Sequence, residues 1–281
     1  MGLDPSVIGV STPPTEFSWS ERDVMLYAVA VGAGSAEPTA ELNLTTENTA
    51  GQALAVLPTF ANIITRITRA PVGEVDMTKL VHASQAMELH RPIPTSGRAL
   101  VTATVVEMLD KGSAGVVTQK QVAVDAEDGR PIATTWQTVL IRGAGGFGGE
   151  RGATKRVTIP EREADFVRTA SVRPEQALLY RLTGDRNPLH SDPAFAARGG
   201  FDKPILHGMC TYGFTGRLLV ENFAAREPSR MRWMEGRFTR PVVPPAQLTV
   251  EMWVEDGAVL FRTSADGGVV IDAGRAVFAN D

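Results

Sequence analysis

Residues 180–190 read YRLTGDRNPLH, and residues 204–210, a short distance further on, read PILHGMC. The two stretches contain an Asp, an Asn and two of the four His of the chain. Gly184 and Pro188 disfavour a continuous helix, so we expect Asp185 to His190 to form a bent loop. A loop with a carboxylate five residues before an imidazole can direct both groups at one small volume, where they share a water molecule or a proton.

Length and composition are those of an ordinary globular protein with room for two domains. The chain has 281 residues, of which 43% are hydrophobic and 21% charged, which is enough for a sizeable core. Its net charge of −4 disfavours nucleic-acid binding, because phosphate-binding surfaces usually carry a basic excess. Basic residues are scattered along the chain, which is compatible with a local anionic ligand.

Compartment and membrane association follow from the cysteine count and the apolar stretches. The single cysteine, Cys210, excludes an internal disulfide and a Cys-rich zinc site, and it fits a reducing compartment. The first twenty residues lack the pattern of a secretory signal. No apolar stretch reaches the roughly 18 residues that span a membrane. We therefore expect a cytoplasmic protein with no membrane association.

Periodicity and turn residues predict the elements of the first half. Ser20 and Asp23 mark the start of a helix that continues over residues 24–31. A second helix is predicted over residues 51–64, with Pro58 as an internal complication. Strands are predicted at residues 79–87, 99–108, 115–124 and 132–141, with hairpin turns at residues 110–112 and 127–129.

A glycine-rich segment separates two halves of the chain. Residues 143–148, GAGGFG, formally match the GxGxxG pattern of dinucleotide-binding sites. The residues that follow show no apolar helical period, so we interpret the segment as a linker. The predicted organisation is an N-terminal half at residues 1–145, a linker at residues 146–163 and a C-terminal half at residues 164–281.

The two halves repeat one pattern of short helix, loop, longer apolar helix and antiparallel strands. The matching segments are residues 26–27 and 179–180 (LY), residues 57–60 and 206–209 (LPTF and LHGM), and residues 91–94 and 240–244 (RPIP and RPVVP). An apolar helix has to be covered, and a curved antiparallel sheet can wrap around it. The predicted fold class is α+β, with two helix-wrapped sheets packed together.

The halves differ at the polar positions. The first half has residues 32–34 (GAG) where the second has Gly184 and Asp185, and it has Pro58 where the second has His207 and Gly208. Pro58 lacks an N–H, so its helix start cannot present the same donor. We expect polar machinery in the C-terminal half and an N-terminal half that accommodates a medium or long apolar chain.

The quoted stretches resemble the hydratase 2 motif of MaoC-like enoyl-CoA hydratases, which GDRNPLH at residues 184–190 matches throughout. Nearly the whole chain resembles the double hot-dog members, which include (R)-specific 3-hydroxyacyl-thioester dehydratases. The further matching segments are residues 80–85 (LVHASQ), 91–94 (RPIP), 110–112 (DKG) and 236–242 (GRFTRPV). Family members usually have Gly-Glu at the positions of Ala83 and Ser84.

The resemblance implies a hydro-lyase of fatty-acid metabolism that reversibly hydrates a trans-2-enoyl-CoA to a (3R)-3-hydroxyacyl-CoA. Asp185 and His190 would hold and divide the water, with His190 taking its proton and Asp185 serving C2, and the reverse order stays open. Asn187 would orient the loop or the water. The N–H of Gly208, at the start of a helix predicted over residues 209–220, would stabilise the oxyanion.

The resemblance also implies contacts to the acyl-CoA. Those contacts are His82, Ala83, Lys111, Gly208 and Phe238, with Arg240 as a weaker candidate. A cation on a turn suits a phosphate, whereas an aromatic ring suits the acyl or pantetheine arm. The thioester is the substrate, and neither a cofactor nor a metal is predicted.

Other interpretations of single residues stay open. Asp185 can be read as a cap of the next turn and His190 as a surface histidine. His207 is either a neighbour that shapes the pocket or a satisfied core histidine. Asp185, His190 and His207 as metal ligands match no spacing pattern known to us.

Two other functions are compatible with the same fold. A hot-dog acyl-CoA thioesterase generally needs a carboxylate on the central helix, and residues 210–220 contain none. A non-catalytic acyl-thioester-binding subunit is disfavoured by the intact set of Asp185, Asn187 and His190. The sequence leaves open the acyl chain length, CoA versus acyl carrier protein, the direction of the reaction and a possible homodimer.

Overall fold

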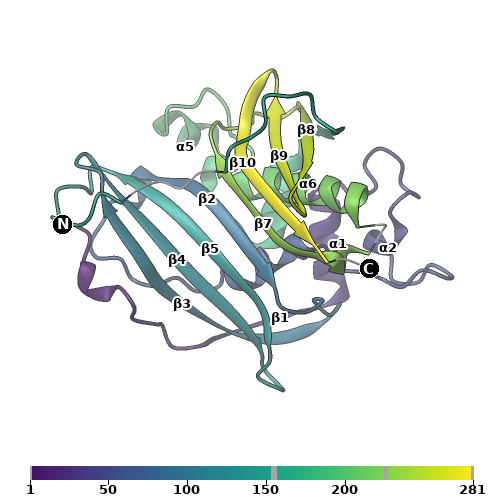
Figure 1. The fold of residues 1–281 in the computed structure, drawn as a ribbon, viewed down its shortest axis with the longest axis horizontal. Coiled ribbons are helices and arrows are strands. Elements are labelled where there is room, and N and C mark those ends of the chain that lie inside the picture. The colour runs from purple at the N-terminus through teal and green to yellow at the C-terminus, as the bar shows by residue number, and fades with distance from the viewer. Residues whose placement is uncertain (1, 153–156, 225–226, 280–281) are drawn as a thin grey trace.

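A computed structural model describes residues 2–152, 157–224 and 227–279. Its strands form one curved antiparallel sheet of ten in the order β1-β3-β4-β5-β2-β7-β10-β9-β8-β6 (Figure 1). The N-terminal half comprises β1 (Thr15–Trp19), β2 (Leu80–Leu89), β3 (Gly97–Asp110), β4 (Ala114–Asp125) and β5 (Pro131–Arg142). The C-terminal half comprises β6 (Phe166–Val172), β7 (Met231–Phe238), β8 (Ala246–Glu255), β9 (Ala258–Ala265) and β10 (Gly268–Phe278).

The strand order reflects the predicted repeat. The last five strands follow the first five in reverse order, as two copies related by a two-fold axis between β2 and β7 require. At this seam Ser84 pairs with Arg237 and Met87 with Met234. The α+β class and the four predicted strands of the first half are confirmed. The two predicted sheets pack together by joining edge to edge, through backbone pairing of β2 with β7.

The helices cover one side of the sheet, and α6 lies behind the strands of the C-terminal half in Figure 1. They are α1 (Glu21–Ala30), α2 (Leu42–Thr45), α3 (Ala61–Thr65), α4 (Gln176–Tyr180), α5 (Pro193–Arg198) and α6 (Gly208–Phe223). Single 3-10 turns are η1 (Pro5–Val7), η2 (Pro58–Phe60), η3 (Met77–Lys79), η4 (Arg181–Thr183), η5 (Pro188–His190) and η6 (Pro228–Arg230). None of the helices in the described ranges is both long and apolar enough to cross a bilayer.

Helix α6 is the most deeply buried helix of the C-terminal half. Phe214 and Leu219 are fully buried on it, in the core that both halves share. A Cβ at Gly216 would meet the side chain of Thr59 in η2. The absence of a side chain at Gly216 therefore lets the central helical segments of the two halves come into contact.

The predicted start of α1 at Ser20 is confirmed, and the cap consists of two hydrogen bonds from Ser20 to Asp23. The Asp23 carboxylate accepts hydrogen bonds from the backbone N–H of Ser20 at 2.9 Å and from its hydroxyl at 2.6 Å. The helix extends over Glu21–Ala30 and ends before the turn at Gly32.

The predicted helix over residues 51–64 is wrong in its first half. Residues 51–57 are not helical, and the helical segment starts with η2 at Pro58 and continues as α3 to Thr65. Leu57 is extended, with φ −62° and ψ 130°, because the ring of a following proline disfavours the α conformation. Proline at the first helical position is tolerated, so Pro58 begins the segment and does not interrupt it.

The structure also corrects the register of the repeat. His207, which precedes α6, has φ −59° and ψ 131°, nearly the conformation of Leu57 before η2. The two helix starts therefore pair Leu57 with His207 and Pro58 with Gly208. The sequence comparison, which paired Leu57 with Leu206, is one residue out.

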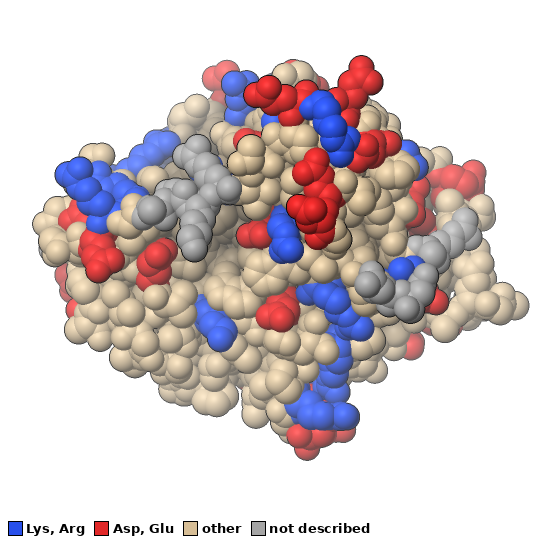
Figure 2. All heavy atoms as spheres, in the orientation of Figure 1, with Lys and Arg blue, Asp and Glu red and all other residues tan. Residues whose placement is uncertain are grey.

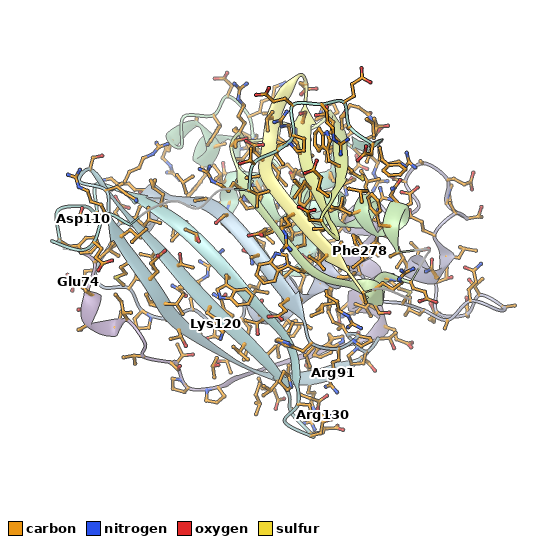
Figure 3. All side chains as sticks on the ribbon, viewed as in Figure 1. Glu74, Arg91, Asp110, Lys120, Arg130 and Phe278 are labelled. Carbon is orange, nitrogen blue, oxygen red and sulfur yellow. The ribbon has the colours of Figure 1, made fainter. Side chains whose placement is uncertain are left out.

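The glycine-rich segment after β5 folds around a carboxylate at the tip of the β3–β4 hairpin (Figure 3). Asp110 accepts hydrogen bonds from the N–H groups of Gly112, Gly146 and Gly148 at 2.8, 2.9 and 2.9 Å. No helix follows before β6 in the described part of this segment, although a dinucleotide-binding motif requires one. Residues 153–156 of the predicted linker lie outside the described residues, and the boundaries of the halves stay a prediction.

Candidate active site

Residues 183–190 form the predicted bent loop. Gly184 ends η4 with φ +112°, a left-handed conformation that glycine adopts readily. The Asp185 carboxylate then accepts a hydrogen bond from the N–H of Asn187 at 3.3 Å. The side-chain oxygen of Asn187 caps η5 by accepting from the N–H of Leu189 at 3.0 Å. The Asn187 side chain is thus engaged in shaping the loop, one of its two predicted roles.

His190 is held in one tautomer. Its Nδ1 lies 2.9 Å from the carbonyl oxygen of Ile205, so Nδ1 carries the proton and donates it. Nε2 is then unprotonated and can accept a proton. Burial lowers the pKa of His190, against the smaller opposing effects of Ile205 and Asp185. His190 is therefore a neutral base at neutral pH.

His207 connects the predicted catalytic loop, residues 183–190, to α6. It is 1% exposed, and its Nε2–H donates to the backbone carbonyl of Asp185 at 3.1 Å. Its ring stacks on that of His190, with centroids 3.7 Å apart, while Nδ1 has no hydrogen-bond partner among the described residues. Burial lowers the pKa of His207 to about 3. His207 is thus a core histidine that also sets the positions of both predicted catalytic residues.

Asp185 is ionised at neutral pH. Burial raises its pKa, but the His207 side chain, the N–H of Asn187 and the Arg66 guanidinium outweigh that effect and leave the pKa below its usual value. A deprotonated carboxylate and a neutral imidazole therefore share this loop. Neither group carries a proton for a substrate until it has taken one from water.

The start of α6 brings the second predicted group of residues to the loop. Gly208 is the first residue of this sixteen-residue helix, where backbone N–H groups have no partner within the helix. Its Cα faces the ring of Phe238, since a Cβ on Gly208 would lie 3.4 Å from that ring. Phe238 in turn lies 4.7 Å, centroid to centroid, from His82 across the β2–β7 seam. Burial lowers the pKa of His82 to about 4, while the charge of Asp185 raises it, which places His82 near the catalytic loop.

The other predicted substrate contacts are more widely distributed. Ala83 lies in β2 where the pairing with β5 slips between His82 and Ser84. The ammonium of Lys111 donates to the carbonyl oxygens of Arg151 and Gly152, in the segment after β5. Arg240 is exposed and lies against Gly268 at the start of β10. The roles of these three residues in ligand binding stay predictions.

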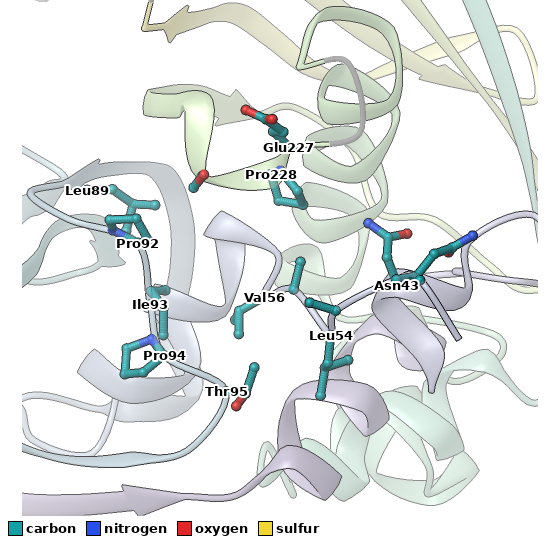
Figure 4. A pocket seen from close by; sticks show the side chains of 15 residues that line it. Asn43, Leu54, Val56, Leu89, Pro92, Ile93, Pro94, Thr95, Glu227 and Pro228 are labelled. Atoms are coloured by element: carbon teal, nitrogen blue, oxygen red, sulfur yellow. The ribbon is translucent and has the colours of Figure 1, made fainter. Parts of the chain in front are cut away.

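A cavity of about 670 Å³ lies in the N-terminal half (Figure 4). Its walls come from the residues before η2, the end of β2 with the loop after it, and residues 227–229 before β7. The residues around the catalytic loop come from the equivalent places: before α6, the end of β7 and the start of β2. The cavity is therefore the two-fold counterpart of the predicted active site. Its described lining contains one carboxylate, Glu227, and no Lys, Arg or His, so it lacks an imidazole base and a cationic phosphate ligand.

On the face drawn in Figure 2, acidic and basic side chains are interspersed, and the lower left of the face is mostly uncharged. Across the described ranges, no three His, Cys, Asp or Glu side chains are grouped closely enough to hold a metal ion. Cys210 is buried, and its thiol lies 3.4 Å from the carbonyl oxygen of Ala30. Burial raises the pKa of this thiol.

Sequence reasoning missed two contacts that shape the site. The carbonyl of Ile205 fixes the tautomer of His190, and Arg66 of the N-terminal half reaches the loop at Thr183. Arg66 and Thr183 are 117 positions apart, and no local pattern signals such a contact. The carbonyl of Ile205 is a backbone group, which residue identity does not reveal.

A neutral imidazole, a carboxylate and a helix N-terminus around one loop are the components of acid–base addition to, or elimination from, a carbonyl compound. The class of protein that this arrangement defines is a hydro-lyase. The fold places the imidazole, the carboxylate and the helix N-terminus in the C-terminal one of its two related halves.

Comparison with known proteins identifies the family. Residues 155–273 match the model described as MaoC like domain, and residues 17–143 match the MFE-2 hydratase 2 N-terminal domain. The 3-hydroxyacyl-thioester dehydratase Y of Mycobacterium tuberculosis is 42% identical over 291 residues, covering 99% of both chains. The enoyl-CoA hydratase ChsH3 of the same organism is 38% identical over 277 residues, covering 94% of both chains.

A solved structure agrees with these sequence matches. The MaoC-like dehydratase from Phytophthora capsici has a TM-score of 0.88 and 28% identity, covering 99% of both chains. The chain belongs to the MaoC-like hydratase and dehydratase family. The predicted resemblance, the hot-dog fold and the prediction of a hydro-lyase are thereby confirmed.

Proposed function

We propose that this hydro-lyase reversibly adds water to a trans-2-enoyl-CoA to give the (3R)-3-hydroxyacyl-CoA. The observation that carries the proposal is the pairing of neutral His190, whose Nε2 is free to accept a proton, with ionised Asp185 on one loop beside the start of α6. The names of the similar proteins, an enoyl-CoA hydratase and a 3-hydroxyacyl-thioester dehydratase, support hydration and its reversal.

The proposed reaction follows from the protonation states. His190 Nε2 accepts a proton from a water molecule, with Asp185 holding that water, as the water oxygen bonds to C3. The π electrons of the C2–C3 double bond form a double bond between C1 and C2, and those of the thioester carbonyl move to its oxygen, where the N–H of Gly208 stabilises the negative charge. The proton then returns to C2, directly from His190 or by way of Asp185. Dehydration is the same sequence reversed, and neither direction requires a cofactor.

We also propose how the thioester is held. His82 and Phe238 contact the pantetheine or acyl arm, because they lie together beside Gly208. Lys111 and Arg240, both exposed, bind phosphate groups of CoA or of the prosthetic arm of an acyl carrier protein as cations. Ala83 lies at the slip in β2, where the main chain approaches the ligand.

The N-terminal half is proposed to accommodate a medium or long acyl chain. Leu54 and Val56 line the cavity, whereas Leu57, Phe60 and Ile63 are buried in the core. The central helical segment of this half spans only residues 58–65, which leaves more of the concave face of its sheet uncovered than α6 does. Turnover of four-carbon and ten-carbon enoyl-CoAs tests this, and a strong preference for four carbons would count against it.

The function is tested by following the loss of the enoyl absorbance of a trans-2-enoyl-CoA and determining the chirality of the product. Wild type is expected to give the (3R)-alcohol, and Asp185→Asn and His190→Ala to lose at least about a hundredfold in kcat. Asp192→Asn is the matched control, because Asp192 only caps α5 and asparagine caps equally well. Release of free CoA by wild type would favour a thioesterase, and binding without turnover would favour a binding subunit.

Oligomeric state and location are also proposals. Hot-dog proteins bury their sheets pairwise, and here the pairing of β2 with β7 already joins two such sheets within the chain. We propose a homodimer, which light scattering of the purified protein would test. A cytoplasmic location is supported by the single, buried Cys210 and is tested by fractionation of the source cells.

A further inference from the structure

Arg66, which follows α3 in the N-terminal half, reaches the catalytic loop of the C-terminal half. Its Nη2 donates to the carbonyl oxygen of Thr183, two residues before Asp185. Gly184 stands between them, and a Cβ on Gly184 would collide with Nη2 of Arg66. The left-handed turn favours glycine, and the absence of a side chain at Gly184 also leaves room for the guanidinium in this position.

The other half contains the counterpart of this contact. Arg217 of α6 donates from Nε to the carbonyl oxygen of Val31 at 3.1 Å, and Gly32 follows with φ +87°. Here Nη1 of Arg217 also binds the two carboxylate oxygens of Glu41, at 2.9 and 3.0 Å. Each central helical segment thus sends an arginine to the glycine turn of the opposite half.

The two contacts differ in what balances the charge of the arginine. Glu41 neutralises Arg217, whereas Arg66 forms no ion pair with a carboxylate in the described part of the chain. Burial raises the pKa of Asp185, and the uncompensated Arg66 is one of the groups that lower it. The positive charge of Arg66 therefore acts on the catalytic carboxyl.

The other titratable groups that act on the Asp185 carboxyl are uncharged at neutral pH, because burial lowers the pKa of an imidazole and raises that of a phenol. These groups are His82 on β2, Tyr180 on α4, His190 on the loop and His207 before α6. Arg66 is thus the neighbour of Asp185 that keeps its charge throughout the neutral range.

We propose that Arg66 is a positioning residue of the catalytic site, supplied by the N-terminal half, which fixes the Thr183–Gly184 turn and holds Asp185 next to a permanent positive charge. The consequence for catalysis rests on the proposed hydration. The contact between the halves does not depend on that function.

The test compares Arg66→Gln, which removes the charge, with Arg66→Lys, which keeps it. The Asp185 carboxyl is titrated by ¹³C NMR and assigned with Asp185→Asn. Its midpoint is expected to rise by about one pH unit in Arg66→Gln and by less in Arg66→Lys. At neutral pH, kcat is expected to fall about tenfold in Arg66→Gln, with KM within about twofold of wild type. Arg69→Gln, an exposed arginine three residues further on, is the control and should leave the midpoint unchanged.

An unchanged midpoint in Arg66→Gln overturns the proposal whatever the rate, and so does a shifted midpoint with an unchanged kcat. Should Arg66→Gln fail to fold by circular dichroism, Arg66→Met gives the decision, because it also removes the charge. A kcat equal to that of Arg69→Gln with an unmoved midpoint in that variant overturns the proposal. If wild type does not hydrate enoyl-CoA, the titration alone decides the contact, so that result counts against the function only.

Discussion

The two central helical segments start with nearly the same backbone conformation, but only the start of α6 offers a backbone N–H donor. Leu57 and His207 enter their helical segments with nearly equal φ and ψ, yet Pro58 follows one and Gly208 the other. Proline leaves no N–H at a position where glycine offers one, and the shape of the chain is unaffected. In the proposed mechanism, activity depends on a few side chains and one backbone group of the C-terminal half, and the N-terminal half keeps the same fold without them.

Replacing a residue of one half by its counterpart in the other is expected to reduce the rate most in Gly208→Pro, which introduces the proline found at position 58. His207 already has the extended conformation that a following proline requires, so the variant should fold. It loses the proposed oxyanion donor, and kcat should fall about a hundredfold or more. Gly208→Ala is the matched control, because it keeps the N–H and its Cβ would make ordinary contact with Phe238. Equal rates for the two variants would remove the N–H from the mechanism.

A smaller loss is expected from His207→Leu, which makes this position resemble Leu57. The backbone carbonyl of Asp185 loses its donor and His190 loses its stacking partner. Steady-state kinetics should give a kcat about tenfold lower with a nearly unchanged KM, because the residue positions the catalytic groups without binding substrate. His207→Gln retains an N–H donor and should recover part of the rate. A normal kcat in His207→Leu would make His207 a residue of the core alone.

The pH dependence of the rate tests the protonation state of His190 in the C-terminal half. His190 must be unprotonated to act, and burial lowers its pKa below the ordinary 6.5. We expect kcat/KM to stay level as pH falls from 8 to 6.5 and to decrease only below that value, where His190 takes up a proton. A pH–rate profile that already falls between pH 8 and 7 would contradict the assigned pKa of His190.

The smallest expected effect is that of Pro58→Gly, which restores an N–H to the N-terminal half. The described lining of its cavity has no His and a single carboxylate, Glu227, so an added donor would lack the imidazole base that the proposed mechanism requires. The hydration rate should stay within about twofold of wild type. A clear gain in turnover from Pro58→Gly combined with Asp185→Asn would mean that a second catalytic site exists.

The sequence was most informative where structure depends on neighbours in the chain. The strands, the hairpin turns and the bent loop around Gly184 and Pro188 were predicted because alternation, glycine and proline act locally. The same local rule misled the prediction at Pro58, where a proline read as an interruption is the start of the segment. The repeat was detected, but an error of one residue went unnoticed because apolar residues flank both helix starts.

Long-range contacts explain the rest. Asp185, His190 and Gly208 lie within 24 positions of one another, whereas Arg66 reaches the loop from 117 positions away. His82 and Phe238 were expected as ligand contacts only through the family resemblance. Their proximity results from the edge-to-edge joining of β2 and β7, which no pattern within either strand specifies.

The central claim is that each chain has one thioester site, built around the C-terminal loop. Calorimetric titration of folded Asp185→Asn with a trans-2-enoyl-CoA measures the number of sites directly, because this variant should bind without turnover. With a four-carbon enoyl-CoA, which does not need the acyl-chain space of the N-terminal half, we predict one thioester per chain, with binding weakened by a change at Phe238 and unaffected by filling the N-terminal cavity with Thr95→Trp. Two equivalent thioesters per chain, the second lost on filling that cavity, would contradict the central claim.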